Sequence, residues 1–277
     1  MCILFTILEI LFGIVAAVVV LSYAIAWYEY ANREPFLMQE RFAPGRLWFA
    51  AKLIATETVL LFVTVLLHPL GWFSFKEKPA ASVDGAPVLF LHGLFHNRAC
   101  WLWARFRLRN RGYKALYAIN LPPWYDVERL TERVSKKVDE LRHSSGVDKV
   151  HLVGHSMGGM IARNYIQFRG GEQKVDACVL LSAPNGGSKL VPFALTPLGK
   201  LLLPGSDFLQ RLAAAPLPPE VRMTAIVNRH DNMVLPFEYG RLEGVPNVEL
   251  SGMGHASVLY RSRAIEAIVQ SLREPGP

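Results

Sequence analysis

Short apolar runs alternate with amphipathic segments over the last two thirds of the chain. Runs of mostly apolar residues predict buried strands, and apolar residues at helical spacing between them, as in 127–143, predict helices that pack on a sheet. Strands that alternate with helices predict an α/β fold with a doubly wound, mostly parallel sheet. We expect strands at 87–91, 114–119, 148–153, 176–182, 222–227 and 247–250, and helices at 98–110, 127–143, 157–169 and 256–272.

The first third of the chain differs, because its apolar runs are long. Residues 10–28 contain no charged side chain, and at 1.5 Å per residue they span roughly the 30 Å hydrocarbon core of a bilayer. Trp27 and Tyr28 at the far end match an interfacial aromatic belt. A cleaved signal peptide is the alternative, but residues 1–9 carry no Lys or Arg. We therefore expect an uncleaved transmembrane helix at 10–28.

A second apolar segment at 47–67 is long enough to span a membrane but contains Lys52 and Glu57. A charge near the bilayer centre costs about 2.5–3.5 kcal/mol on insertion scales, and Glu57 is too far from either end to escape easily. Two arrangements accommodate it. Glu57 faces the first helix in a hairpin, or the segment lies in the membrane interface.

The sequence Gly-His-Ser-Met-Gly at 154–158 directly follows an apolar run and precedes apolar residues at helical spacing. A strand that turns sharply into a helix through Gly-x-Ser-x-Gly is the nucleophile elbow of a hydrolase, because the glycines allow a tight, strained turn. Ser156 then lies at the positive end of a helix, where developing negative charge is favoured. We expect Ser156 to be the nucleophile.

A serine nucleophile needs a base and an acid that orients the base. Asp231 and His255 each follow a predicted strand, so both lie at the carboxyl edge of a parallel sheet, where ligands bind. The order Ser, Asp, His is the one expected for this fold. Asp176 precedes its strand, and Asp207 falls in an apolar insertion. We therefore expect a triad of Ser156, Asp231 and His255.

An oxyanion hole needs two backbone N–H groups, one from the residue after the nucleophile and one from the loop after an early strand. Met157 supplies the first. The strand at 87–91 leads into His-Gly-Leu, and we expect Leu94 to supply the second. We expect His92 to bond within its own loop rather than to take part in the chemistry.

These motifs together resemble bacterial lipases and esterases of the α/β-hydrolase superfamily. His-Gly-Leu at 92–94, Gly-His-Ser-Met-Gly-Gly at 154–159 and the late Asp and His carry the resemblance, which covers about residues 86–272. The segment 182–188 is similar to the family's Pro-His-x-Gly-Ser segment, with Asn185 where a His is usual. The resemblance implies a serine hydrolase that cleaves carboxylic esters through an acyl-enzyme. It implies an ester or lipid substrate and neither metal nor organic cofactor.

Three other functions stay open. An acyltransferase or an amidase would use the same triad, and a non-catalytic membrane-binding scaffold would not need the triad intact. Residues 188–219 form an insertion rich in Leu, Phe and Pro, as in a small cap. This cap either covers an acyl-binding pocket, contacts lipid or packs on the domain.

The chain carries a net charge of +7, yet no basic stripe matches a nucleic-acid-binding motif, so we expect no nucleic-acid partner. The arginines between 98 and 111 form either a solvated helix face or a surface that attracts anionic lipid headgroups. The three cysteines have no metal-binding spacing, and no disulfide is predicted. The sequence carries no signal for an oligomeric state.

We divide the chain into a membrane-anchoring region at 1–75, a linker at 76–86 and a catalytic domain at 87–277. If both apolar segments span, the arginines between them favour a cytoplasmic loop and a periplasmic catalytic domain at a bacterial inner membrane. If only the first spans, the catalytic domain stays in the cytoplasm. An anchor of this kind predicts that a chain beginning near Ala80 folds and keeps its kcat on short, soluble esters.

Overall fold

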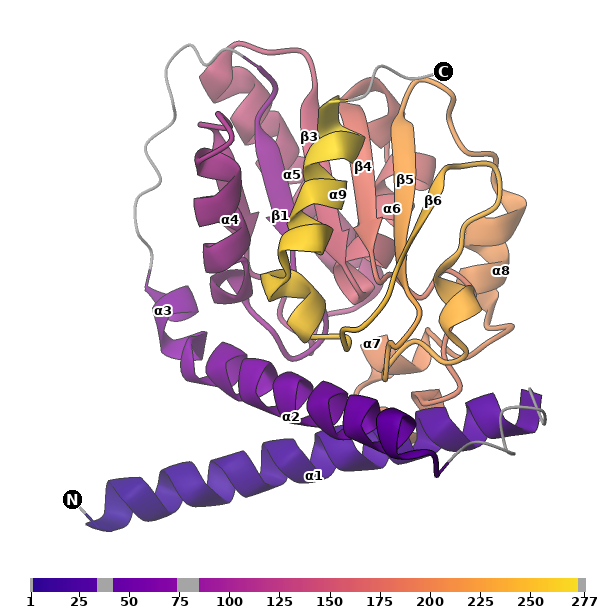
Figure 1. The fold of residues 1–277 in the computed structure, drawn as a ribbon. Coiled ribbons are helices and arrows are strands. Elements are labelled where there is room, and N and C mark those ends of the chain that lie inside the picture. The colour runs from indigo at the N-terminus through magenta and orange to yellow at the C-terminus, as the bar shows by residue number, and fades with distance from the viewer. Residues whose placement is uncertain (1, 34–41, 74–84, 274–277) are drawn as a thin grey trace.

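A single parallel sheet forms the centre of the molecule. The computed structural model describes residues 2–33, 42–73 and 85–273. Its six strands are ordered β2-β1-β3-β4-β5-β6, and every neighbouring pair is parallel, which confirms the predicted doubly wound sheet (Figure 1). The strands are β1 (Val88–Leu91), β2 (Leu116–Ile119), β3 (Val150–His155), β4 (Val175–Leu181), β5 (Arg222–Asn228) and β6 (Asn247–Leu250).

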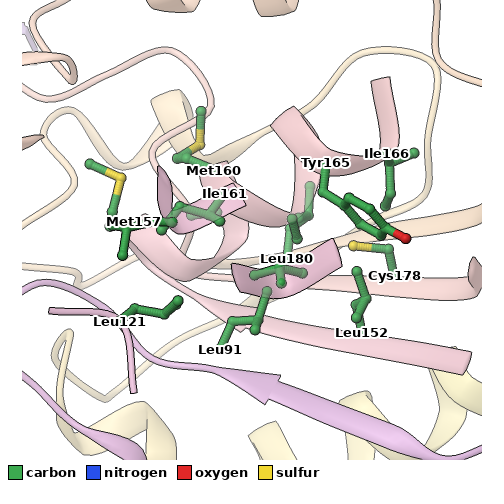
Figure 2. Packing of buried hydrophobic residues seen from close by; sticks show 14 of the residues in the cluster. Leu91, Leu121, Leu152, Met157, Met160, Ile161, Tyr165, Ile166, Cys178 and Leu180 are labelled. Carbon is green, nitrogen blue, oxygen red and sulfur yellow. The ribbon is translucent and has the colours of Figure 1, made fainter. Parts of the chain in front are cut away.

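Helices cover both faces of this sheet. Alternate residues of a strand point to opposite faces, so Leu89 and Leu91 of β1 join the core under α5 and α6, whereas Val88 and Phe90 join the core under α4 and α9. Figure 2 shows the first core, in which Leu91, Leu152 and Leu180 lie beneath α6. The helices are α4 (Leu102–Arg109), α5 (Val127–Ser145), α6 (Met157–Phe168) and α9 (Ser262–Arg273).

Two predicted helices begin later than expected, because their first turns are 3-10 helices. The segment predicted at 98–110 opens with η2 (Arg98–Trp101), and the segment predicted at 256–272 opens with η6 (Ser257–Tyr260). In η2 the Asn97 side chain accepts a hydrogen bond from the Ala99 N–H, which caps the turn. Residues 251–256, between β6 and η6, form a loop at the carboxyl edge of the sheet.

The N-terminal region forms two long helices and one short one: α1 (Cys2–Arg33), α2 (Pro44–Leu66) and α3 (His68–Trp72). α1 and α2 are long and apolar enough to span a membrane, and both exceed the lengths predicted for them. They run antiparallel, with the rings of Phe12 and Phe62 5.2 Å apart. We call α1 and α2 the N-terminal hairpin. It lies across the carboxyl edge of the sheet, with α2 nearer to the sheet and α1 outside it (Figure 1).

The predicted linker at 76–86 lies almost wholly outside the described residues. The predicted cap at 188–219 joins β4 to β5 and contains η4 (Val191–Phe193), α7 (Pro197–Lys200) and α8 (Asp207–Ala214). Part of this cap packs on the domain, because Leu198 and Leu209 are buried in the α5/α6 core. Phe193 and Leu195 are instead 69% and 87% exposed.

Candidate active site

Ser156 occupies a strained turn between β3 and α6. Its φ of 53° and ψ of −126° lie in a region that non-glycine residues seldom adopt. Glycines make the turn possible. A Cβ at Gly154 would lie 2.5 Å from the Cα of Gly159, and a Cβ at Gly158 would lie 2.3 Å from the carbonyl oxygen of Leu91. α6 begins at the next residue, so the serine stands at the N-terminus of that helix.

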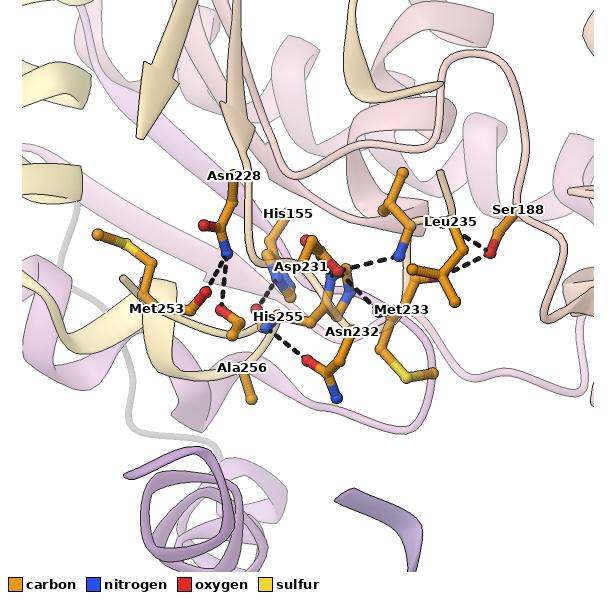
Figure 3. A network of polar contacts seen from close by, with 12 residues as sticks. His155, Ser188, Asn228, Asp231, Asn232, Met233, Leu235, Met253, His255 and Ala256 are labelled. Carbon is orange, nitrogen blue, oxygen red and sulfur yellow. Dashed lines mark hydrogen bonds and ion pairs between the residues drawn. The ribbon is translucent and has the colours of Figure 1, made fainter. Parts of the chain in front are cut away.

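Asp231 and His255 are in direct contact. Nδ1 of His255 lies 2.9 Å from Oδ2 and 3.0 Å from Oδ1 of the carboxylate, and both side chains are buried (Figure 3). Asp231 Oδ1 also accepts hydrogen bonds from the N–H groups of Met233 and Val234 at 2.8 and 2.9 Å. Because Nδ1 faces the carboxylate, Nε2 is the ring nitrogen left to exchange a proton with a nucleophile.

His255 differs electrostatically from the histidines beside it. Burial lowers its pKa, but the Asp231 carboxylate and, to a smaller extent, Glu57 outweigh burial, so the pKa of His255 is raised above the usual 6.5. Burial holds the pKa of His155 well below its usual range and lowers the pKa of His96 to about 3. His255 is therefore the histidine whose protonated form this environment favours.

The loop after β1 lies against the serine. A Cβ at Gly93 would lie 2.8 Å from the Cβ of Ser156, which leaves room there for glycine alone. Leu94 is the next residue in this loop, and Met157 follows the serine at the start of α6. The two residues expected to supply oxyanion N–H groups thus belong to segments that flank Ser156.

His92 holds this loop in place. Its Nε2 accepts a hydrogen bond from the Leu121 N–H at 2.8 Å, and its Nδ1 lies 2.8 Å from the Gly93 carbonyl oxygen. Burial lowers the pKa of His92 to about 4, so the ring is neutral. The Gly93 contact lies within the loop of His92, as expected from the sequence, whereas the Leu121 contact joins this loop to the one after β2.

The competing acids lie elsewhere. Asp176 is near the start of β4 and pairs with Arg222 at 2.6 Å, at the opposite edge of the sheet from Ser156. Asp207 is the first residue of α8. Asn185, which replaces the family's usual His, is buried. It accepts from Arg163 at 3.0 Å and donates to the Gly240 carbonyl at 2.8 Å. These bonds connect α6 with the loop after β4 and with the backbone at Gly240, so Asn185 has a structural role.

Three polar residues that the sequence did not single out for the site contact the His255 loop. His155 places Nε2 2.9 Å from the His255 carbonyl oxygen, with the two rings 4.7 Å apart. Asn232 Oδ1 accepts from the His255 N–H at 3.0 Å. The carboxylate of Glu57 accepts from the N–H groups of residues 256 and 257. Two of these residues carried a sequence signal: His155 lies within the Gly-His-Ser-Met-Gly motif, and Glu57 is a charge inside an apolar run.

The contacts of Glu57 extend an expectation. The hairpin arrangement predicted that its carboxylate faces the first helix, and Tyr23 of α1 does lie beside it, since a Cβ at Gly254 would be 2.3 Å from Oε2 of Glu57 and 2.5 Å from the Tyr23 hydroxyl oxygen. The carboxylate also accepts hydrogen bonds from the backbone of the catalytic domain, across a separation of about 200 residues in the chain. The hairpin itself forms, with α1 packed on the outer side of α2.

The His, Cys, Asp and Glu side chains also bear on whether the chain has a metal site. Among residues 2–33, 42–73 and 85–273, no group of three or more His, Cys, Asp or Glu side chains is placed to hold a metal ion. Cys100 and Cys178 are free and buried, and burial raises the pKa of the Cys178 thiol to about 12. A thiol so protonated is a poor nucleophile.

Comparison with known proteins agrees with the fold. A family model described as the alpha/beta hydrolase family matches residues 88–240, which run from β1 past Asp231. The mature form of a lipase from Bacillus licheniformis is similar, at a TM-score of 0.59 and 18% identity, over 69% of this chain and 94% of that one. Lipase B from Aspergillus fumigatus is similar, at a TM-score of 0.62 and 20% identity, over 72% of this chain and 56% of that one.

A third solved structure is an alpha/beta hydrolase enzyme from a sediment metagenome of the Mar Chica lagoon in Morocco. It is similar at a TM-score of 0.52 and 19% identity, over 68% of this chain and 90% of that one. At these identities the likeness concerns the fold.

Proposed function

The chain belongs to the alpha/beta hydrolase family, and from that premise we propose that it is a serine hydrolase that cleaves carboxylic esters with Ser156, His255 and Asp231. The contact between His255 and Asp231 at 2.9 Å carries the proposal. It supplies an oriented base whose ring packs on His155, the residue next to the strained serine. The names of the similar lipases favour an ester substrate.

In the proposed mechanism Ser156 attacks the ester carbonyl carbon while Nε2 of His255 takes the hydroxyl proton. The N–H groups of Leu94 and Met157 hold the negative oxygen of the tetrahedral intermediate. Its collapse expels the alcohol, which receives the proton from His255. Water then attacks the acyl-enzyme with the same base and releases the acid. Asp231 holds the imidazole tautomer and stabilises the imidazolium. Each step uses groups of the chain itself, so the scheme includes no cofactor.

We further propose that the N-terminal hairpin binds a membrane and that the enzyme meets lipid or lipid-partitioned esters there. The outer part of α1 supports this, because Ile3, Leu4 and Phe5 are 77%, 65% and 64% exposed. Phe193 and Leu195 of the cap add exposed apolar surface. If both helices of the hairpin span a bacterial inner membrane, the arginines of the loop between them favour a cytoplasmic loop and a periplasmic catalytic domain.

The test is activity-based labelling of the full-length protein with a fluorophosphonate, together with hydrolysis of p-nitrophenyl esters of increasing chain length. We expect labelling of the wild type, and Ser156→Ala should lose both labelling and turnover, apart from slow residual catalysis by the oxyanion hole. Ser144→Ala, at the exposed end of α5, is the matched control and should keep both. Labelling at another serine with activity retained would contradict the assignment.

Paired ester and amide substrates, and added acceptor alcohols, separate hydrolysis of esters from amidase and transferase activity.

A further inference from the structure

Glu57 of α2 is one of the most deeply buried charged side chains of the molecule, at 1% exposure. Both of its carboxylate oxygens are used. Oε1 accepts a hydrogen bond from the Ala256 N–H at 2.6 Å, and Oε2 accepts from the Ser257 N–H at 2.9 Å. These two N–H groups directly follow His255 in the chain. The carboxylate of an N-terminal helix therefore holds the backbone that carries the proposed base.

The loop is shaped to receive this carboxylate. A Cβ at Gly254 would lie 2.3 Å from Oε2 of Glu57 and 2.5 Å from the hydroxyl oxygen of Tyr23, so any larger residue there would push the helices away. The Gly254 N–H in turn donates a hydrogen bond to the Ser257 hydroxyl oxygen at 2.8 Å. Burying a carboxylate is costly unless donors satisfy it, and here backbone N–H groups are those donors.

We propose that Glu57 is a positioning residue for His255, which makes the N-terminal hairpin a working part of the active site as well as its membrane anchor. The inference rests on the proposed function, because it assigns Glu57 to the loop of the proposed base. Two effects follow. The two hydrogen bonds fix the loop and hence the place of the imidazole, and the nearby negative charge stabilises the imidazolium.

The electrostatic effect can be separated from simple packing. The titratable groups that face His255 are Asp231 from the loop after β5, Glu57 from α2, and the neutral rings of His155 and His96. Tyr23 from α1 adjoins the Glu57 carboxylate. The two carboxylates raise the pKa of His255, so removal of the Glu57 charge lowers it. The base must be neutral to act, and the acid limb of the pH profile should therefore move to lower pH.

The experiment compares full-length wild type and Glu57→Gln in the same detergent, with a short p-nitrophenyl ester as substrate. The glutamine amide can accept only one of the two N–H bonds. We expect kcat to fall by about a hundredfold, the loss typical of a misplaced catalytic group, while KM changes little. We also expect the acid limb of kcat/KM to shift downward in pH. Wild-type kcat together with an unchanged acid limb would overturn the proposal.

Glu29→Gln is the matched control. Glu29 of α1 pairs with Lys189 of the cap at 2.5 Å, so this change also weakens the docking of the hairpin but lies away from the His255 loop. It should leave kcat and the acid limb unchanged. If Glu29→Gln reproduced both effects of Glu57→Gln, docking alone would explain them and the proposal would fail.

If Glu57→Gln fails to fold, Glu57→Asp is the variant to measure. It keeps the negative charge but moves the carboxylate oxygens away from the two N–H groups by the length of one methylene. We expect a reduced kcat with an acid limb close to that of wild type, and a wild-type kcat would overturn the proposal. Fluorophosphonate labelling separates this test from that of the function. If wild type labels at Ser156 while the Glu57 variants behave as wild type, the positioning role fails alone. If wild type does not label, the proposed function fails.

Discussion

Asn232 connects the first helix to the backbone of His255. Its Nδ2 donates a hydrogen bond to Oγ of Ser22 in α1 at 2.7 Å, and its Oδ1 accepts from the His255 N–H at 3.0 Å. The bond joins residues 210 positions apart. Together with the Glu57 carboxylate, this bond links both long N-terminal helices to the loop that contains His255. An anchor that merely tethers a domain would not need such contacts.

Removal of the hairpin should therefore damage turnover. We expect a chain beginning at Ala80 to lose at least about tenfold in kcat on a short, soluble ester, because the N–H groups of Ala256 and Ser257 lose their acceptor and the loop loses its support. This expectation replaces the one drawn from an independent domain. The measurement is kcat in one detergent for both chains, with circular dichroism as the check on folding. A truncated chain that folds and keeps full kcat would contradict this prediction and support a hairpin that only tethers the domain.

Asp231→Asn should leave the fold intact and reduce kcat by roughly 10⁴-fold, because the amide favours the wrong imidazole tautomer. The amide oxygen can still accept from the N–H groups of Met233 and Val234, which preserves the turn. Steady-state kinetics with thermal unfolding measures both properties. Asp207→Asn, at the exposed start of α8, is the control and should behave as wild type. If Asp207→Asn lost activity while Asp231→Asn kept it, the acid of the triad would instead be Asp207 in the cap.

The pH profile follows from the raised pKa of His255. Burial opposes the shift, but Asp231 and Glu57 outweigh it, so the acid limb of kcat/KM should have its midpoint above pH 6.5. Because the pKa of His255 is higher in the folded than in the unfolded state, protonation of His255 stabilises the fold. This contribution is fully present below the pKa of the unfolded state and is lost as pH rises through the pKa of the folded state. Asp231→Asn should lower the midpoint by removing the larger raising cause. A wild-type midpoint below 6.5 would contradict this environment for the base.

Gly93→Ala should disturb the nucleophile directly. The added Cβ would lie 2.8 Å from the Cβ of Ser156, so the loop or the serine must move, and overpacking of this kind costs about 1–3 kcal/mol. We expect a lower melting temperature and slower fluorophosphonate labelling. Gly45→Ala, where nothing lies within 4 Å of the new Cβ, is the control. Equal labelling rates for the two variants would argue against close contact between this loop and Ser156.

Local patterns were enough to predict the sheet and the turn at Ser156. A strand, a glycine-flanked serine and a helix follow one another within 19 residues, from Val150 to Phe168, so short-range geometry determines the turn. The order of strands and helices then predicts that the ends of β3, β5 and β6 lie at one edge of the sheet, which places Ser156, Asp231 and His255 along that edge. The assignment of those residues as a triad stays a prediction, because no measurement of activity bears on it.

The tertiary structure alone decided what the N-terminal helices contact. In the sequence, Glu57 was an unfavourable charge inside an apolar segment, and neither its partner nor its direction could be derived from neighbours along the chain. The groups that donate hydrogen bonds to Glu57 are the N–H groups of Ala256 and Ser257, which lie about 200 residues away in the chain. They belong to the backbone, which has no sequence signature. Asn232 and Ser22 meet for the same reason. Periodicity reports which face of a helix is apolar, whereas the packing of distant elements determines what that helix holds.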